Sequence, residues 1–406
     1  MSNNTQPEIR FPGFTEAWEQ RKFKDFTKIS QGLQIAISNR FLNEGENRLF
    51  YITNEFLNPS SSVKYYIENA PETVIANSDD ILMTRTGNTG KVVTNVHGAF
   101  HNNFFKIAYD KSKTNKLFLF YLLNSNYIQN EIRIGAGSST IPDLKHPNFY
   151  KINVNTTSLE EQTKIGNFFK SLDDTIALHQ RKLDLLKETK KGFLQKMFPK
   201  NGAKVPEIRF PGFTEDWEER KLSEVANHRG GTAIEKYFKE DGKYKVISIG
   251  SYGLDSKYVD QNIRAVSNEV TDSRVVRNGE LTMVLNDKTA NGTIIGRSLL
   301  IEEDNKYVIN QRNEIISPKE NFDSNFAYTI LNGPFRESVK RIVQGGTQIY
   351  VNYPAVSNLV LKLPDVEEQK KIGLFFKQLD DTIALHQRKL DLLKETKKGF
   401  LQKMFV

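Results

Sequence analysis

A run of 27 residues occurs twice in the chain without a single difference. Leu172–Phe198 and Leu379–Phe405 both read LDDTIALHQRKLDLLKETKKGFLQKMF. When the comparison is extended upstream to Glu160 and Glu367, the two copies agree at 36 of 39 positions. The chain is therefore a tandem duplication, and its fold must place the same long segment in two equivalent positions.

The repeated run has the heptad spacing of a coiled-coil helix. Seam residues recur at alternating intervals of four and three, the pattern that winds two helices into a left-handed supercoil. Ser158–Glu161 and Asp365–Glu368 precede the two copies and have the form of capping boxes that start helices. The predicted seam residues are Leu172, Ile176, His179, Leu183, Leu186, Lys190, Phe193 and Met197, and then Leu379, Ile383, His386, Leu390, Leu393, Lys397, Phe400 and Met404.

The natural partner of each helix is the other copy. In a parallel pair Lys190 would face Lys397, and the two ammonium groups would repel each other. In an antiparallel pair each seam lysine faces a seam histidine, which can accept a hydrogen bond when it is neutral. We therefore expect the antiparallel pair, rather than two core helices that each pack only on their own domain. Its expected layers are Leu172–Met404, Ile176–Phe400, His179–Lys397, Leu183–Leu393, Leu186–Leu390 and Lys190–His386.

A shorter repeat opens each half of the chain. Pro7–Lys22 returns as Pro206–Lys221 with 14 of 16 positions identical, and we call these two stretches the motif segments. Trp18 is predicted to pin the first motif segment onto its domain. Between each motif segment and each long helix, at 23–159 and 222–366, the sequences of the two halves no longer resemble each other.

The two variable regions have the pattern of mixed α and β structure. Each has one predicted helical stretch, Lys116–Asn130 and Asn325–Arg341, and Gly and Asn residues separate short β-type runs. The predicted strands are Leu49–Thr53, Asp80–Thr84, Phe104–Tyr109, Tyr244–Ile249 and Tyr307–Asn310.

We therefore expect an α+β fold with an internal pseudo-two-fold repeat. It consists of two α/β domains, each followed by a long helix, and the two helices pair as an antiparallel coiled coil. The expected parts are a motif segment and first variable domain at 1–159, a first helix at 160–198, a linker at 199–205, a motif segment and second variable domain at 206–366, and a second helix at 367–406.

Composition and motifs argue against several classes of protein. The chain has no cysteine, and Met1–Gln6 is too polar for a signal peptide, so we expect a cytoplasmic protein without a membrane span. Its six histidines have no metal-site spacing, so no metal site is expected. Gly135–Thr140 lacks the third glycine of a dinucleotide fingerprint, and Asn352–Ala355 has only one of the two prolines of a base-methylating pocket. We expect no catalysis and no cofactor in this chain, while the net charge of +8 suits a polyanionic partner.

The order of these motifs resembles the specificity subunit of type I restriction–modification systems. The resemblance rests on Arg-Phe-Pro-Gly-Phe, on Asp80–Gly90 and Gly137–Asp143, and on Glu-Glu-Gln followed by Ile, Phe-Phe and Leu-Asp-Asp in both halves. The second half departs from it at Asn278–Asp287 and Gly345–Tyr350. The resemblance implies two target-recognition domains that each read half of a gapped site in double-stranded DNA. It also implies paired helices that dock two methyltransferase (modification) subunits and two restriction (translocase/nuclease) subunits, which would carry S-adenosylmethionine, ATP and Mg²⁺.

Candidate DNA contacts are the side chains suited to reading base edges. Arg and Lys suit guanine, Asn and Gln suit adenine, and hydroxyl groups suit either base. The candidates in the first domain are Arg85, Asn88, Lys91, His101, Asn102, Asn103, Ser138, Ser139 and Thr140. Those in the second domain are Lys288, Asn291, Gln311, Arg312, Asn313, Thr347 and Gln348.

Two other functions are compatible with parts of the pattern. A duplicated coiled-coil adaptor that binds only protein would show no salt-dependent affinity for DNA. A self-sufficient methyltransferase would need the cofactor motifs that the sequence lacks. The function expected from the sequence is therefore that of a DNA-specificity subunit.

Overall fold

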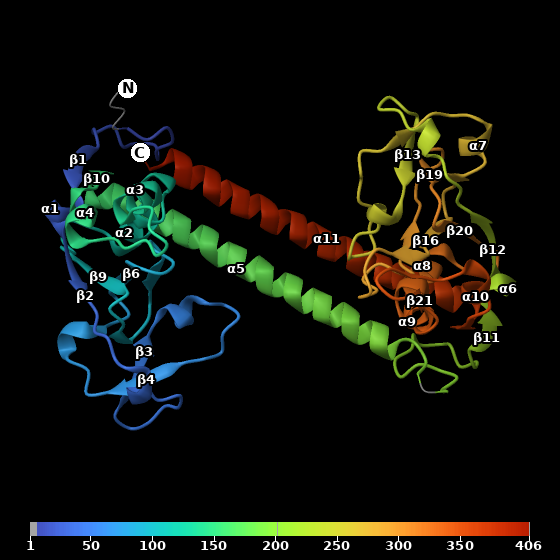
Figure 1. The fold of residues 1–406 in the computed structure, drawn as a ribbon, viewed down its shortest axis with the longest axis horizontal. Coiled ribbons are helices and arrows are strands. Elements are labelled where there is room, and N and C mark those ends of the chain that lie inside the picture. The colour runs from blue at the N-terminus through green and yellow to red at the C-terminus, as the bar shows by residue number, and fades with distance from the viewer. Residues whose placement is uncertain (1–5, 201, 406) are drawn as a thin grey trace. The chain divides into compact units, whose positions relative to one another are not determined.

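A computed structural model describes residues 6–200 and 202–405, so the expectation for the first five residues lies outside the described part. The chain divides into two compact units (Figure 1). Unit 1 contains Met1–Arg181 and Arg388–Val406, and unit 2 contains Lys182–Gln387. Each unit therefore holds one variable region, the start of the helix that follows it, and the end of the other long helix. The expected α+β architecture is confirmed.

Unit 1 is built on two four-stranded sheets and a two-stranded ribbon. Neighbouring strands are antiparallel except for the parallel pair β3 and β8. The first sheet has the order β2 (Thr27–Gln31), β9 (Phe104–Tyr109), β6 (Ile81–Thr84) and β7 (Val92–Thr94). The second has the order β4 (Tyr65–Glu68), β3 (Arg48–Ile52), β8 (Gly98–Phe100) and β5 (Ile75–Ala76), and β1 (Glu19–Lys22) pairs with β10 (Asn153–Thr156).

Unit 2 repeats this topology although its sequence differs. Its first sheet has the order β12 (Ala226–Gly230), β20 (Asn313–Pro318), β16 (Leu281–Val284) and β18 (Ser298–Leu300). Its second has the order β14 (Arg264–Ala265), β13 (Tyr244–Ile247), β19 (Tyr307–Ile309) and β15 (Val275–Val276), and β11 (Glu218–Lys221) pairs with β23 (Val360–Leu363). An additional sheet joins β17 (Asn286–Asp287), β22 (Ile349–Tyr350) and β21 (Gln344–Gly345). The duplication thus extends through the variable regions, which share a fold without sharing a sequence pattern.

The helices also correspond, apart from the additional short helix α7 (Glu269–Asp272) of unit 2, and each predicted helical stretch is broken into two. Ser125 accepts a hydrogen bond from the Ile128 backbone N–H and caps a new helix. In unit 2 the break falls at Gly333, and Pro334 then starts the next helix without an N–H to satisfy. The helices of unit 1 are α1 (Phe23–Phe26), α2 (Lys116–Leu123), α3 (Asn126–Ala136) and α4 (His146–Lys151). Those of unit 2 are α6 (Leu222–Val225), α7 (Glu269–Asp272), α8 (Ser324–Asn332), α9 (Pro334–Arg341) and α10 (Tyr353–Ser357).

The two long helices are α5 (Leu159–Lys196) and α11 (Val366–Lys403). Their N-caps are confirmed, because Ser158 Oγ accepts from the Glu161 N–H and Asp365 Oδ1 accepts from the Glu368 N–H. The expected return bond of a capping box does not form at Glu161. Its buried carboxylate instead accepts two hydrogen bonds from Arg10 of the motif segment, at 2.7 and 2.8 Å.

The clamp between the motif segment and the helix is repeated in unit 2. Arg209 donates two hydrogen bonds of 2.8 Å to the buried carboxylate of Glu368. Bidentate guanidinium–carboxylate pairs are strong and directional, and a buried carboxylate requires such a partner. The arginine of Arg-Phe-Pro-Gly-Phe and the second glutamate of Glu-Glu-Gln therefore hold the motif segment to the helix.

Glycine lets each long helix cross its domain closely. A Cβ added to Gly166 would lie 2.7 Å from Leu117 Cβ and 2.9 Å from the Phe118 backbone nitrogen. At Gly373 it would lie 2.6 Å from the Phe326 nitrogen. Nearby, buried Trp18 packs on Phe118, with ring centroids 6.0 Å apart, which confirms its predicted role as a pin.

The long helices pair in the antiparallel sense within each unit. In unit 1 the start of α5 lies beside the end of α11, because Phe168 packs edge-to-face on Phe400 at 5.0 Å. In unit 2 the equivalent rings of Phe375 and Phe193 are also 5.0 Å apart. All of the predicted seam residues are buried or partly buried, so the heptad pattern located the packed face.

The predicted register of this pair is wrong. Lys397 forms an ion pair with Asp173 at 2.5 Å instead of facing His179. Lys190 likewise pairs with Asp380 at 2.5 Å instead of facing His386. A carboxylate is a stronger partner for an ammonium group than a neutral imidazole, and both ion pairs are partly shielded from water. The layers of the sequence-based register are displaced with them, since Phe400 meets Phe168 and not Ile176.

The end of each helix enters the core of the unit in which it finishes. Met404 and Phe405 are buried in the core of unit 1, where Phe405 packs on Phe118 and Phe169. Met197 and Phe198 occupy the same place in the core of unit 2. The ending of one helix therefore fills a socket in the domain that precedes the other helix.

Candidate nucleic-acid interface

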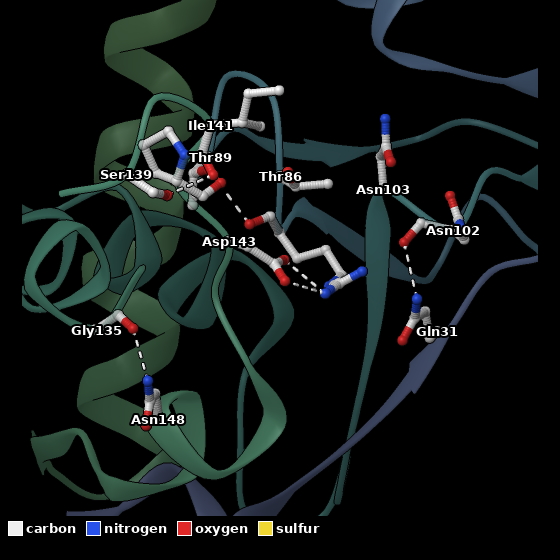
Figure 2. Close-up of polar contacts among 12 residues, drawn as sticks. Gln31, Thr86, Thr89, Asn102, Asn103, Gly135, Ser139, Ile141, Asp143 and Asn148 are labelled. Carbon is white, nitrogen blue, oxygen red and sulfur yellow. Dashed lines mark hydrogen bonds and ion pairs between the residues drawn. The ribbon is translucent and has the colours of Figure 1, made fainter. Parts of the chain in front are cut away.

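Three predicted segments of unit 1 come together at one end of its sheets. They are the turn 85–91 after β6, the turn 101–103 between β8 and β9, and the loop 137–143 after α3. The Arg85 backbone N–H donates to the Asn103 carbonyl at 2.7 Å, and the Arg85 carbonyl accepts from the Leu144 N–H at 2.8 Å. These bonds place all three segments side by side (Figure 2).

The turn 85–91 is held by hydrogen bonds between a buried threonine and the backbone of the turn. Thr84 Oγ1 donates to the Asn88 carbonyl at 2.6 Å and accepts from the Lys91 N–H at 2.9 Å. Gly90 has φ of +91°, and a Cβ there would lie 2.8 Å from Gln129 Oε1, so glycine is required. The side chains of Asn88 and Lys91 are exposed and available to a partner.

Arg85 is not a free side chain. Its guanidinium forms an ion pair with Asp143 at 2.5 Å, which ties the first turn to the loop 137–143 (Figure 2). Asp143 was not among the predicted contacts, although it ends the Gly137–Asp143 motif. The exposed part of that loop carries Ser138, Ser139 and Thr140, and Ser139 Oγ donates to the Ile141 carbonyl at 2.8 Å.

In the turn 101–103 one side chain supports the backbone and two amide side chains are partly exposed. Burial, reinforced by the charge of Arg40, lowers the pKa of His101, whose Nδ1 accepts from the Asn103 N–H. Asn102 donates from Nδ2 to Gln34 Oε1 at 3.2 Å, and its carbonyl accepts from Gln31 Nε2 at 3.2 Å. Gln31 ends β2 and Gln34 lies just beyond it, and both were missed because β2 was not among the strands predicted from the sequence.

Unit 2 builds the same arrangement without the ion pair. The Leu285 N–H donates to the Arg312 carbonyl at 2.9 Å, and the Leu285 carbonyl accepts from the Val351 N–H at 2.9 Å. Leu285 therefore occupies the position of Arg85, and Tyr350 that of Asp143. Asn278–Asp287 and Gly345–Tyr350, where the sequence departs from the first half, thus provide equivalent backbone contacts with different side chains.

The first turn of unit 2 is a longer loop, and two buried charges hold it. The Gly296 N–H donates to the Val284 carbonyl just as the Gly90 N–H does to the Thr84 carbonyl. Within this loop, buried Asp287 accepts from the N–H groups of Thr289 and Ile294, at 3.0 and 2.8 Å. Lys288 and Asn291 are exposed on it.

Arg336 supports the same loop from α9. Its side chain is buried and donates to the carbonyls of Ile295, Gly292 and Thr293 at 2.8 to 2.9 Å. Burial and the nearby charge of Arg297 lower the pKa of Arg336 to about 10. Neither Asp287 nor Arg336 was predicted to belong to this site, because their roles depend on contacts distant in sequence.

The turn 310–312 lies between β19 and β20, as 101–103 lies between β8 and β9, and Asn313 is the first residue of β20. Asn313, a predicted DNA contact, is 1% exposed, and its Nδ2 donates to the carbonyls of Asn310 and Gln311. Its side chain therefore supports the turn and does not reach the surface. Gln311, Arg312, Thr347 and Gln348 are exposed.

The described residues contain no group of three or more His, Cys, Asp or Glu side chains that could hold a metal ion. Across those same residues, no helix combines the length and apolar character needed to cross a membrane. The exposed candidate side chains on the two surfaces are amides, hydroxyls and cations, and Ile141 and Tyr350 are exposed beside them.

One domain fold occurs twice in the chain, and each copy carries exposed amide, hydroxyl and cationic side chains on the equivalent turns. The family model of the type I restriction modification DNA specificity domain matches residues 15–188 and 214–395. The chain belongs to this family, as the sequence motifs predicted. It is therefore a non-catalytic DNA specificity component of a type I restriction–modification system.

The chain is similar to proteins of this kind over nearly its whole length. It is 26% identical over 405 residues to the type I restriction enzyme MjaVIII specificity subunit of Methanocaldococcus jannaschii, covering 95% of this chain and 91% of that protein. The S subunit of the type I restriction–modification system of M. genitalium has a similar fold, with a TM-score of 0.66, 14% identity and 99% of both chains covered. A chain from a structure on complex assembly and conformational transition of the type I R-M system gives a TM-score of 0.53 at 16% identity, covering 97% of both chains.

Proposed function

We propose that this chain reads a gapped site in double-stranded DNA, with one half-site contacted by each unit. The observation that carries the proposal is the recurrence of the same convergence of segments in both units, through the backbone bonds of Arg85 and of Leu285. The same strand order with different exposed side chains suits two readers of different sequences. Half or more of the contacts are expected to go to phosphates, since these position a protein on the duplex.

In unit 1 the proposed contacts are the exposed and partly exposed side chains of the three segments. Arg85 positions this surface through Asp143, and His101 supports the turn that carries Asn102 and Asn103. The remaining contacts would come from Asn88, Lys91, Ser138, Ser139 and Thr140. In unit 2 they would come from Lys288, Asn291, Gln311, Arg312, Thr347 and Gln348.

The helix pair is proposed to dock two methyltransferase subunits, and two restriction subunits are proposed to complete the complex. Leu178 and Leu185 are 60% and 67% exposed on α5, and Leu385 and Leu392 are 62% and 67% exposed on α11. Leucines seven residues apart lie on one face of a helix, which suits packing against a partner helix. S-adenosylmethionine, ATP and Mg²⁺ would then act in the partner subunits.

Exchange of one variable region tests the proposal directly. Residues 23–159 would be replaced by the matching region of a relative, the chain would be co-expressed with its methyltransferase subunit, and methylated bases would be mapped by single-molecule sequencing. One half of the methylated site is expected to change while the other is retained. The proposal fails if both half-sites change together, or if the native complex methylates no gapped site.

The alternative function, an adaptor that binds only protein, is tested by measuring how the affinity for DNA depends on salt. Because phosphate contacts release counterions, the affinity of the assembled complex should fall by a factor of roughly 10³ to 10⁵ between 50 and 200 mM salt if about 6–10 phosphates are contacted. An affinity that does not depend on salt would favour the adaptor.

A further inference from the structure

Arg312 is held in a backbone conformation that its residue type disfavours. It lies at the tip of the turn between β19 and β20 with φ of +69°. Residues other than glycine, asparagine and aspartate seldom have a positive φ, because this backbone conformation is strained for them. Such strain persists only where the surrounding structure enforces it. The position is therefore constrained by something other than local preference.

Backbone hydrogen bonds from two neighbouring segments hold the turn in place. The Arg312 carbonyl accepts from the Leu285 N–H at 2.9 Å, and the Asn313 carbonyl accepts from the Gly231 N–H at 2.8 Å. A Cβ on Gly231 would lie 2.1 Å from the Asn310 carbonyl oxygen, so the backbone of Gly231 packs directly against that of the turn. These contacts fix the direction in which residue 312 leaves the turn.

Every polar neighbour of Arg312 within the turn is already engaged. Asn310 and Gln311 both donate to Glu235 Oε1 at 3.0 Å, and Asn313 donates to the carbonyls of the turn. The guanidinium of Arg312 is exposed, and within the described part of the chain no hydrogen bond or ion pair engages it. In unit 1, by contrast, the guanidinium of Arg85 is paired with Asp143.

We propose that Arg312 is the residue of unit 2 that identifies a guanine in its half-site, by donating two hydrogen bonds to O6 and N7 in the major groove. An arginine fork matches this pair of acceptors, and a rigid turn limits the entropy lost on contact. Arg312 thereby determines specificity at one base pair. This inference rests on the proposed function, because it assumes that the surface of unit 2 faces DNA.

The test uses the full chain assembled with its methyltransferase subunit, and maps methylation across a library of sites. The half-site of unit 2 is first assigned by exchanging residues 222–366. Arg312→Ala should then lower discrimination at one G·C pair of that half-site by roughly 5- to 150-fold, the range of one bidentate contact. The other half-site should be unchanged.

Arg312→Gly separates specificity from folding. Glycine accepts a positive φ without strain, so this variant should melt at or above the wild-type temperature while losing the same discrimination. Asn305→Gly is the matched control, because Asn305 is exposed with φ of +56° just before the other end of β19. The control should leave the methylated sequence unchanged.

The outcomes distinguish the inference from the proposed function. If the wild-type complex methylates a gapped site and Arg312→Ala retains full discrimination, the guanine contact is refuted while the proposed function stands. If Arg312→Ala weakens binding equally at all sequences and lowers the salt slope by about one, Arg312 contacts a phosphate and the inference also fails. A wild-type complex without any gapped site would refute the proposed function itself.

Discussion

At the scale of the residue, one buried ion pair in each unit attaches the motif segment to the start of the long helix. Glu161 and Glu368 are 0% exposed, and each has an arginine partner from the motif segment. From the sequence, these residues were identified as parts of family motifs, and the glutamates were predicted to belong to capping boxes. Their actual partners lie more than 150 positions away, at a distance over which local pattern has no predictive power.

Arg10→Ala should reduce the free energy of unfolding by about 3–5 kcal/mol, because it removes the charged partner of the buried Glu161 carboxylate, which keeps only the neutral Thr157 hydroxyl as a side-chain donor. The exposed pair of Arg21 and Glu19 provides the control, and Arg21→Ala should cost no more than about 1 kcal/mol. Chemical denaturation of both variants measures the difference. Equal, small losses in the two variants would show that Glu161 reaches water when Arg10 is removed.

The candidate DNA contacts show what residue type alone can predict. The sequence selected side chains with the right chemistry beside glycine turns, and the structure brings the three groups of each unit together. It could not separate readers from supports, because that depends on burial and long-range partners. Asn313 and Arg312 are adjacent in sequence, yet one is buried under the turn and the other is exposed at its tip.

At the scale of the element, each long helix depends on glycine where it crosses its domain and does not depend on glycine elsewhere. Gly166→Ala should destabilise the protein by about 1–3 kcal/mol, because the new methyl group meets Leu117 and the Phe118 backbone. Gly192→Ala in the same helix meets nothing within 4 Å and should stabilise it by roughly 0.5–1 kcal/mol. Thermal unfolding should therefore shift in opposite directions, and a shift in the same direction would refute the close crossing.

The exposed leucines of the helices lead to a prediction about assembly. Leu178→Lys with Leu185→Lys should leave the helical content unchanged, since both side chains are mostly in water, but should prevent one methyltransferase subunit from binding. The same two changes at Leu385 and Leu392 should remove the other subunit. Light scattering of the mixture measures the mass of the complex, and an unchanged mass would exclude this face as the docking site.

The helices themselves were the most predictable part of the chain. Their heptads repeat over many turns, so the packed face could be inferred from periodicity, and the capping residues located the helix starts. The register of the pair could not be inferred in this way, because it depends on which charged residue pairs with each seam lysine. Asp173 lies outside the predicted seam, and a search restricted to seam positions could only offer His179.

At the scale of the whole molecule, each helix begins in one unit and ends in the other. Deleting Arg181–Lys187 and Arg388–Lys394 removes the same heptad from both and keeps the Asp173–Lys397 and Lys190–Asp380 pairs. About 10 Å of helix is lost, which corresponds to about three base pairs and roughly 100° of rotation on DNA. We expect a folded protein that no longer directs methylation to the original site. Folding can be checked by circular dichroism, and wild-type methylation of that site would show that the helices do not set the gap.

The overall plan was predictable from the duplication, whereas the kinship of the variable regions was not. Strand order is a property of pairings across long distances, and it survives when nearly every side chain on the strands has changed. β3 and β13 pair in parallel with β8 and β19 respectively, although the paired residues differ. Such kinship can be detected only after the sheets have been assembled.

The socket of unit 1 that holds Met404 and Phe405 has a further consequence. The end of α5 carries the same residues, so a fragment comprising residues 1–200 contains both a socket and an ending that fits it. Two such fragments should complement each other as a symmetric homodimer, each donating its helix to its twin. That dimer would present one recognition surface twice, in opposite orientations, and would select an inverted repeat instead of two unrelated half-sites.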